Sequence, residues 1–180
     1  MKYIVFDLEA TCWDGAPPND VREIIEIGAL KLNRYGEVID TFSRFVRPKV
    51  NFQLSHYCMA LTGIQQLEIG TASLFPVVIE SFIHWADIWE VDYTLVSWGA
   101  KDLELLLNDC ILHHVETDWI NSHINLKKQY KDLKALHKPI GLLGALKREG
   151  YDFEGRHHRG LDDAINLAKI FLKYIDEWAI

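Results

Sequence analysis

The segment 23–32 constrains the fold more than any other, because it is apolar on both of the faces that a β-strand presents. Successive side chains of a strand point to opposite faces of a sheet. Residues of both parities are mostly apolar: Ile24, Gly28, Leu30 and Leu32 on one face, and Ile25, Ile27 and Ala29 on the other, with Glu26 as the exception among them. A strand of this kind belongs inside a sheet that is covered on both sides.

The remaining segments supply the rest of an α/β fold. Apolar runs bounded by turn residues predict three further strands, over 2–9, 37–47 and 93–97. Helical spacing and capping residues predict helices over 55–61, 74–85, 102–110, 139–149 and 161–178, while 119–134 is helical or irregular. Ser55 is the expected cap of the first helix, and Gly63 its expected left-handed end. This order favours a mixed sheet flanked by helices.

Length and composition limit the class of protein. The chain has 180 residues, of which 49% are hydrophobic, so we expect one domain over 1–180 with its own core. No stretch reaches the roughly 18 uncharged apolar residues of a membrane helix, and the first residues resemble a strand rather than a signal peptide. We therefore expect a cytoplasmic protein with no membrane partner. Cys12, Cys58 and Cys110 are odd in number and far apart, which predicts reduced thiols and no zinc site.

The charge distribution is uneven along the chain. A formal net charge of -7 argues mildly against nucleic acid, since Lys and Arg supply most contacts to phosphate. The segment 122–159, however, contains nine Lys or Arg against four acids. Clustering in sequence permits phosphate binding, although an ordinary solvated surface has the same composition.

Two carboxylates interrupt the first strand. Asp7 and Glu9 stand two positions apart, so both side chains point to the same face of the sheet. Buried carboxylates that lie this close repel each other, and a divalent cation between them is the simplest compensation. Carboxylate oxygens suit Mg²⁺ or Mn²⁺. The alternative is that both acids lie at an exposed strand end and only aid solubility.

Two more acids have the helical phase of core residues. Asp163 is in phase with Leu167 and Phe171 of the last helix, whereas its neighbour Asp162 has the phase of solvent-facing positions, Asn166 among them. Asp102 opens its helix in phase with the apolar positions Leu105 and Leu106. Four inward acids predict a two-metal centre for phosphodiester hydrolysis. His157 and His158, on a Gly-flanked loop, are the candidates for its general base.

Read in order, these residues resemble the DEDDh 3′-to-5′ exonucleases of the ribonuclease T and DNA polymerase III epsilon type. That family has D-x-E on its first strand, a central Asp, and H-x-x-x-x-D near its end. Both histidines satisfy the last spacing, but the choice of Asp163 selects His158. The chain is further similar to the Eri/KapD-like exoribonuclease branch, through the segments 7–12, 23–28, 61–64 and 155–163.

The resemblance implies a fold, a site and a substrate. The fold is ribonuclease H-like, with a five-stranded mixed sheet. Two divalent ions, Mg²⁺ or Mn²⁺, would be bound by Asp7, Glu9, Asp102 and Asp163, with His158 as base. The terminal nucleotide would contact Ala10, Thr11, Leu61 and Thr62. The expected activity is 3′-to-5′ removal of nucleoside 5′-monophosphates from single-stranded or overhanging RNA.

Two other functions use the same residues. A DNA-directed exonuclease of the same family has the same chemistry, because a two-metal centre hydrolyses either polymer and only recognition of the 2′-hydroxyl separates them. A catalytically silent nucleic-acid-binding protein would keep the fold without the reaction. Nucleic acid, and RNA rather than DNA, is therefore the expected partner, and the sequence identifies no protein partner.

Overall fold

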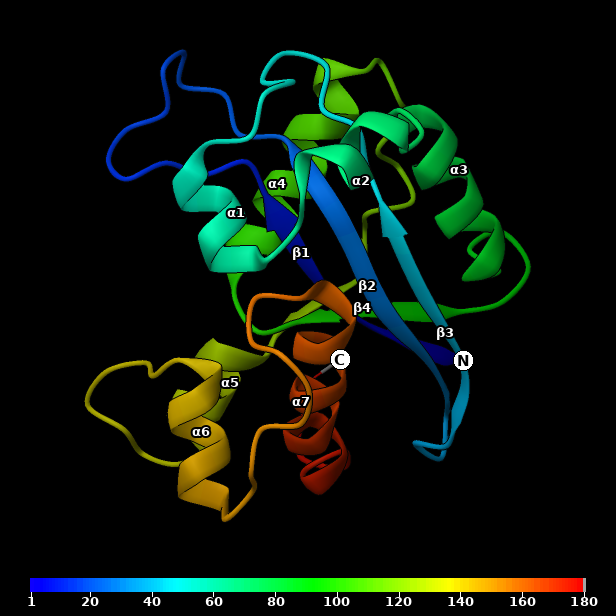
Figure 1. Ribbon diagram of the computed structural model, residues 1–180. Coiled ribbons are helices and arrows are strands. Elements are labelled where there is room, and N and C mark those ends of the chain that lie inside the picture. Colours follow the sequence, from blue (N-terminus) through cyan, green and yellow to red (C-terminus); the bar gives the residue numbers. More distant parts are fainter. Residues whose placement is uncertain (180) are drawn as a thin grey trace.

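A mixed five-stranded sheet with the strand order β3-β2-β1-β4-β5 forms the centre of the computed structural model, which describes residues 1–179 (Figure 1). β2 pairs antiparallel with β1 and with β3, whereas β4 pairs parallel with β1 and with β5. The strands are β1 (Lys2–Ala10), β2 (Ile24–Asn33), β3 (Val38–Phe45), β4 (Tyr93–Ser97) and β5 (His123–Asn125).

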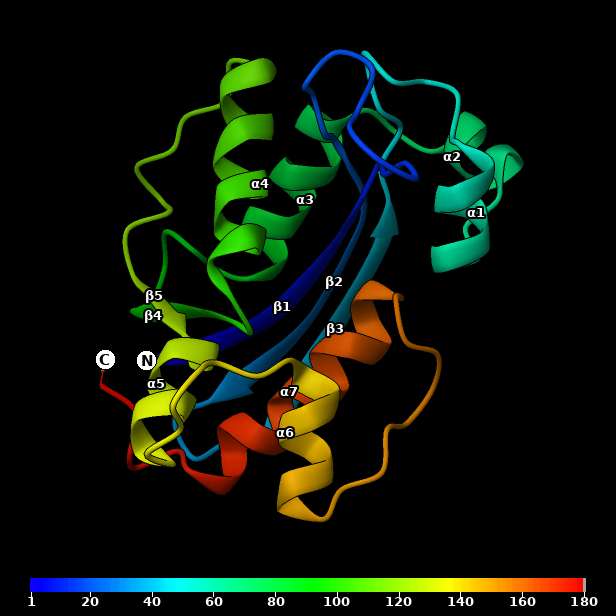
Figure 2. The same cartoon turned by 90° about the vertical axis from the view of Figure 1, so that its left-hand side faces the viewer.

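Helices cover both faces of the sheet. They are α1 (His56–Thr62), α2 (Gln66–Thr71), α3 (Phe75–Trp85), α4 (Ala100–Leu112), α5 (Leu126–Leu133), α6 (Leu142–Glu149) and α7 (Gly160–Lys173). In Figure 2, α3 and α4 lie on one side of the sheet, while α7, with α5 and α6 beside it, lies on the other. Among residues 1–179, no helix combines the length and the apolar character needed to cross a membrane.

The alternation of β1 divides the core into two layers. Tyr3 and Val5 pack with residues of α5, α6 and α7 in one cluster. Ile4, Phe6 and Leu8 pack with residues of α3 and α4 in the other. The prediction of a sheet covered on both sides is confirmed, and the odd residues of β1 face α7.

The residues predicted to begin and end α1 do so in the structure. The Ser55 side chain accepts a hydrogen bond from the backbone N–H of Cys58 at the start of α1, and Gly63 ends that helix in the left-handed conformation with φ 74°. Gly150 ends α6 in the same way, with φ 78°. Cys12, Cys58 and Cys110 are free.

Other boundaries were wrong. The helix expected over 139–149 begins only at Leu142, and α4 extends from Ala100 to Leu112, beyond both expected ends. The last helix stops at Lys173 rather than Trp178. Trp178 still lies in the core, where its indole Nε1 donates to the carbonyl of Phe171. The apolar pattern therefore extends past the end of the helix, because the residues that follow it are also buried in part. β5 and α2 were not predicted individually.

Asn166 was also misplaced. Its helical phase suggested the solvent-facing side of α7, but the residue is fully buried. The side-chain amide donates to the carbonyl of Glu154 at 2.7 Å, and its oxygen accepts from the N–H of the same residue at 3.0 Å. The segment before α7 therefore folds back over this face of the helix and satisfies a polar group there.

A contact between two glycines sets the distance between α7 and the sheet. A Cβ atom on Gly28 of β2 would lie 1.9 Å from the carbonyl carbon of Gly160, the first residue of α7. A Cβ on Gly160 would lie 2.8 Å from the backbone nitrogen of Gly28. Backbone therefore packs directly on backbone at this point, and any larger side chain would push the start of the helix away from β1.

Replacing Gly28 with Ala tests this contact. We expect Gly28→Ala to lower the free energy of unfolding by about 1–3 kcal/mol or more, because the methyl group overlaps backbone atoms that cannot rotate away. Urea denaturation followed by circular dichroism measures the change. The matched control is Gly144→Ala in α6, where a Cβ would meet side-chain atoms of Ile140 at 3.6 Å. That change should raise stability by up to about 1 kcal/mol through helix propensity, and equal effects of both would contradict the close contact.

Candidate active site

Three carboxylates from two elements meet on the α7 side of the sheet. Ligand oxygens of Asp7, Glu9 and Asp163 all lie within 4.8 Å of one another. Asp7 and Glu9 share this face because they are two positions apart on β1, and a register shift follows Glu9. Asp163 lies in the first turns of α7, on the side that faces the strand. The structure thus brings together the three residues that parity and helical phase selected.

Burial and mutual repulsion make these carboxyl groups weak acids. Burial first, and then the negative charge of Asp163, raises the pKa of Glu9 to about 8. The pKa of Asp7 is raised well above its ordinary value, by burial and then by Asp102. Burial also raises the pKa of Asp163. An arrangement that disfavours its own ionisation is one that a cation would stabilise.

Asp102 faces this group from α4 and does not belong to the tight cluster of three. It stands in the first turn of that helix. Burial raises the pKa of its carboxyl group to about 6, although backbone hydrogen bonds, that of Leu8 first, act in the opposite direction. Its charge is the largest electrostatic influence on Asp7. All four predicted acids line the same cleft, three as a cluster and Asp102 beside them.

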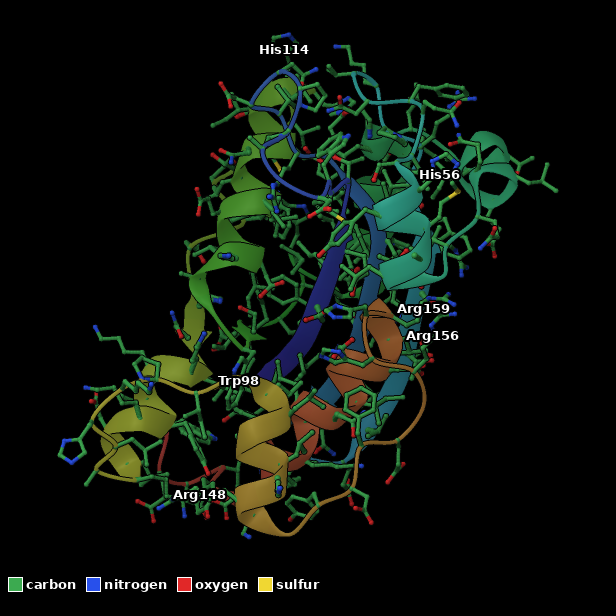
Figure 3. The ribbon with its side chains drawn as sticks, turned by 60° about the vertical axis from the view of Figure 1, so that its left-hand side comes forward. His56, Trp98, His114, Arg148, Arg156 and Arg159 are labelled. Carbon is green, nitrogen blue, oxygen red and sulfur yellow. The ribbon has the colours of Figure 1, made fainter. Side chains whose placement is uncertain are left out.

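The cleft itself has a volume of about 780 Å³ and is open to solvent. Ala10 and Leu61 line it near the end of β1, and Trp98 lies on its wall between β1 and α6 (Figure 3). It also contains four basic residues: Arg22, Lys101, Lys127 and Lys128. Within residues 1–179, none of these four takes part in an ion pair. Their charges can therefore meet an anionic ligand.

Both histidines of the loop before α7 line the cleft. Nε2 of His157 lies 3.6 Å from a carboxylate oxygen of Asp163. The ring of His158 contacts that of His157, with 3.9 Å between the ring centroids and the two planes tilted by 54°. Burial, and then the neighbouring His157, lowers the pKa of His158, so its imidazole is neutral and able to accept a proton near neutral pH. Geometry leaves either residue near enough to act, and the choice of His158 as base stays a prediction.

The four residues expected to contact the terminal nucleotide divide into two pairs. Ala10 and Leu61 line the cleft, as expected. Thr11 and Thr62 are buried, and neither belongs to the cleft wall. The Thr11 hydroxyl accepts from the N–H of Glu23, and the Thr62 hydroxyl donates to the carbonyl of Cys58. These two hydrogen bonds fix the side chains beside the cleft, and contact of Thr11 and Thr62 with the terminal nucleotide stays a prediction.

Sequence reasoning missed two contributors to the site. Trp98 was not among the predicted site residues, yet it lines the cleft, and its indole Nε1 donates to the carbonyl of Ile140. Glu26 was noted only as the exception in an apolar strand. It is 1% exposed, pairs across the sheet with Glu9 and binds the start of α7. Its charge in the middle of a mostly apolar strand was the signal that the sequence offered.

The donor set fits a hard divalent cation. The cluster offers carboxylate oxygens only, which are the ligands that Mg²⁺ and Mn²⁺ prefer over thiolate or imidazole. No other group of three or more suitable ligands occurs among the residues that the structure describes. The crowding of buried acids supplies the electrostatic reason for an ion at this place.

Comparison with known proteins agrees with this geometry. A sequence model of the exonuclease family RNase_T matches residues 4–171. Human 3′-5′ exoribonuclease 1 is 36% identical over 181 aligned residues, which cover 96% of this chain and 52% of the human protein. Probable 3′-5′ exonuclease KapD of Bacillus subtilis is 31% identical over 170 residues, which cover 93% of this chain and 82% of that protein.

A solved structure matches almost the whole chain. The nuclease domain of 3′hExo, a DEDDh family member bound to rAMP, superposes with a TM-score of 0.90 at 35% identity, covering 98% of this chain and 92% of that chain. The fold and the acidic cleft together define a ribonuclease H-like nuclease domain of the DEDDh type. This chain belongs to the RNase_T exonuclease family. It spans about half the length of the human relative.

The raised pKa of Glu9 predicts a pH dependence of stability in the metal-free protein. The folded state holds a proton on Glu9 up to about pH 8, whereas the unfolded chain loses it above its ordinary value of 4.5. Between these values the folded state binds more protons, so the free energy of unfolding should fall as the pH rises from 4.5 to 8. Urea titrations in chelator should give a shallower decline for Glu9→Gln than for the wild type. The same slope of the free energy of unfolding against pH in both proteins would contradict the raised pKa of Glu9.

Proposed function

We propose that this protein is a divalent-metal-dependent 3′-to-5′ exonuclease that acts on RNA and releases nucleoside 5′-monophosphates. The observation that carries the proposal is the convergence of Asp7, Glu9 and Asp163 within 4.8 Å at an open cleft, in a chain of the exonuclease family. Buried acids this close are costly to a fold, and binding of catalytic cations gives a reason for their presence.

The reaction is hydrolysis of the last phosphodiester bond. The oxygen of a water molecule forms a bond to phosphorus, while the bond from phosphorus to the 3′-oxygen of the preceding nucleotide breaks. Asp7, Glu9, Asp102 and Asp163 would hold two Mg²⁺ or Mn²⁺ ions, which lower the pKa of the attacking water and stabilise the leaving oxygen. The leaving 3′-oxygen takes up a proton from solvent, and the new 3′-hydroxyl remains on the shortened strand.

The residues of the chain itself have three tasks in this reaction. His158 accepts the proton of the attacking water, since its lowered pKa keeps the imidazole neutral. His157, beside Asp163, packs against the base and limits its movement. Ala10 and Leu61 hold the terminal nucleotide against the end of β1.

RNA is the proposed substrate for two reasons. The human relative is named an exoribonuclease, and the solved nuclease domain with a TM-score of 0.90 holds rAMP, an RNA monomer. The four basic residues of the cleft provide countercharge for the phosphates next to the acidic centre. DNA as the substrate of the same reaction is the second candidate. The cytoplasmic location expected from the sequence also stays a prediction.

A direct assay tests the proposed function. We expect 5′-labelled single-stranded RNA to yield a ladder that shortens from the 3′ end with Mg²⁺ or Mn²⁺, and no product with chelator. DNA of the same sequence should be degraded more slowly. Asp7→Ala should abolish the ladder, and His158→Ala should lower kcat by roughly 10²- to 10⁴-fold. His157→Ala should have a smaller effect, because this residue is not the proposed proton acceptor.

Each failure in this assay has a distinct meaning. If RNA and DNA both stay intact with either metal, the proposal of an exonuclease is wrong, and a catalytically silent nucleic-acid-binding protein is favoured. Faster cleavage of DNA would move the activity to the second candidate. A larger loss of kcat in His157→Ala than in His158→Ala would exchange the roles of the two histidines.

The basic residues at the start of α5 give a further prediction. Lys127→Ala combined with Lys128→Ala should raise KM roughly tenfold, because both side chains line the cleft and would contact phosphates. The dependence of KM on salt should weaken by about 0.7 in the logarithmic slope for each phosphate that the variant no longer neutralises. Steady-state rates at several salt concentrations measure both effects. Lys131→Ala, whose side chain pairs with Asp132 on the same helix, is the control and should leave KM unchanged.

A further inference from the structure

An ion pair between the buried Glu26 and the partly exposed Arg159 joins the start of α7 to the centre of the sheet. Glu26 of β2 is 1% exposed, and its carboxylate accepts hydrogen bonds from Nε of Arg159 at 3.1 Å and from NH2 at 2.9 Å. The same carboxylate accepts from the backbone N–H of Gly160 at 3.0 Å. The side chain of Arg159, the N-cap residue of α7, makes no capping hydrogen bond to the helix. Glu26 therefore caps this helix from a different element.

Arg159 neutralises the negative charge of Glu26, which lies next to the acidic centre. Glu26 pairs with Glu9 across the two strands, so both carboxylates lie on the same face of the sheet. Within residues 1–179, Arg159 provides the one ion pair to Glu26. A buried carboxylate without its partner is strongly destabilising. The two-donor geometry of the guanidinium also fixes orientation, which a point charge does not.

The same short segment is tied to Asp163. One carboxylate oxygen of Asp163 accepts from the backbone N–H of His158 at 2.7 Å and of Arg159 at 3.1 Å. The N–H of Asp163 in turn donates to the carbonyl of Arg159 at 2.8 Å. Figure 3 shows Arg159 beside Arg156 where α7 begins, next to α1. The backbone of the histidine loop is thus held between a strand residue and a helix residue.

His158 needs such support. Its φ is 66°, in the left-handed region that non-glycine residues enter only at a cost. Conformations of this kind persist only where their surroundings determine them. The neighbouring Arg159 supplies a bidentate anchor one residue away. Loss of that anchor would let the loop relax toward ordinary backbone angles and move the imidazole.

We infer that Arg159 is a positioning residue, which holds the histidine loop over the acidic centre through its bidentate pair with Glu26. The inference rests on the proposed exonuclease function, in which His158 is the base. Neither Arg159 nor Glu26 lines the cleft, so their effect on substrate acts through the loop they hold. Removal of the pair should therefore lower kcat and leave KM nearly unchanged.

Three variants separate positioning from charge compensation. Arg159→Met keeps the aliphatic length of the side chain and removes both hydrogen-bond donors and the charge. Arg159→Lys keeps the charge and loses the two-donor geometry. The double variant Glu26→Gln with Arg159→Met removes both charges together. Lys169→Met, which breaks a pair with the exposed Glu154 further along α7, is the matched control. Each protein is compared for kcat and KM on RNA and for melting temperature in chelator.

The expected pattern has three parts. Arg159→Met should lower kcat by about 10- to 100-fold with KM within about threefold, because misplacement of a catalytic group slows the chemical step. Arg159→Lys should recover part of that loss. The double variant should recover the melting temperature that Arg159→Met loses, while its kcat stays low. Lys169→Met should retain the kcat of the wild type.

Two results would overturn the inference alone. Wild-type kcat in Arg159→Met would mean that the loop is held without this side chain. Recovery of both kcat and melting temperature in the double variant would mean that Arg159 acts only as a countercharge. A wild-type protein without activity on RNA or DNA would instead overturn the proposed function together with this inference.

Discussion

The repulsion among buried carboxylates on one face of β1 is the constraint on which the rest of this structure depends. Asp7 and Glu9 share that face by strand geometry, and α7 adds Asp163 to it. A sheet face that needed only stability would carry apolar residues there, as Tyr3 and Val5 do further along the strand. The fold tolerates the acids because its core is extensive on both sides of the sheet, and because cations can neutralise them.

The docking of α7 is the second requirement, since an acid group assembled from a strand and a helix needs both at a fixed separation. Gly28 and Gly160 allow direct backbone contact, and Glu26 holds the first N–H of the helix. These interactions lie on β2, the strand beside the one that carries the ligands. The strand that contributes apolar residues to both faces therefore also positions the site, through Glu26 and Gly28.

Much of the site could be predicted from local patterns. Period two placed Asp7 and Glu9 together, and helical phase selected Asp163, which is 5% exposed, over Asp162. Contacts between distant residues could not be predicted this way: Glu26 and Arg159 are 133 positions apart, and neither position alone specifies the pair. β5 has three residues and α2 six, too few for a periodic signal. Resemblance to a family, and no local pattern, selected Thr11 and Thr62 for contact with substrate. The sequence also does not indicate that the Thr11 hydroxyl accepts from the N–H of Glu23 or that the Thr62 hydroxyl donates to the carbonyl of Cys58.

The distribution of charge reconciles an acidic chain with the polyanionic substrate proposed for it. The formal net charge is -7, yet part of the negative charge is concentrated where cations are expected to bind, and it would be neutralised in the loaded enzyme. Lys127 and Lys128, from the basic segment of the sequence, line the cleft and are without ion pairs among the described residues. Other lysines of that segment form ion pairs instead: Lys134, which follows α5, pairs with Glu149 at the end of α6. Net charge is therefore a poor guide to the proposed partner, because affinity for phosphate depends on which cations remain unpaired beside the site.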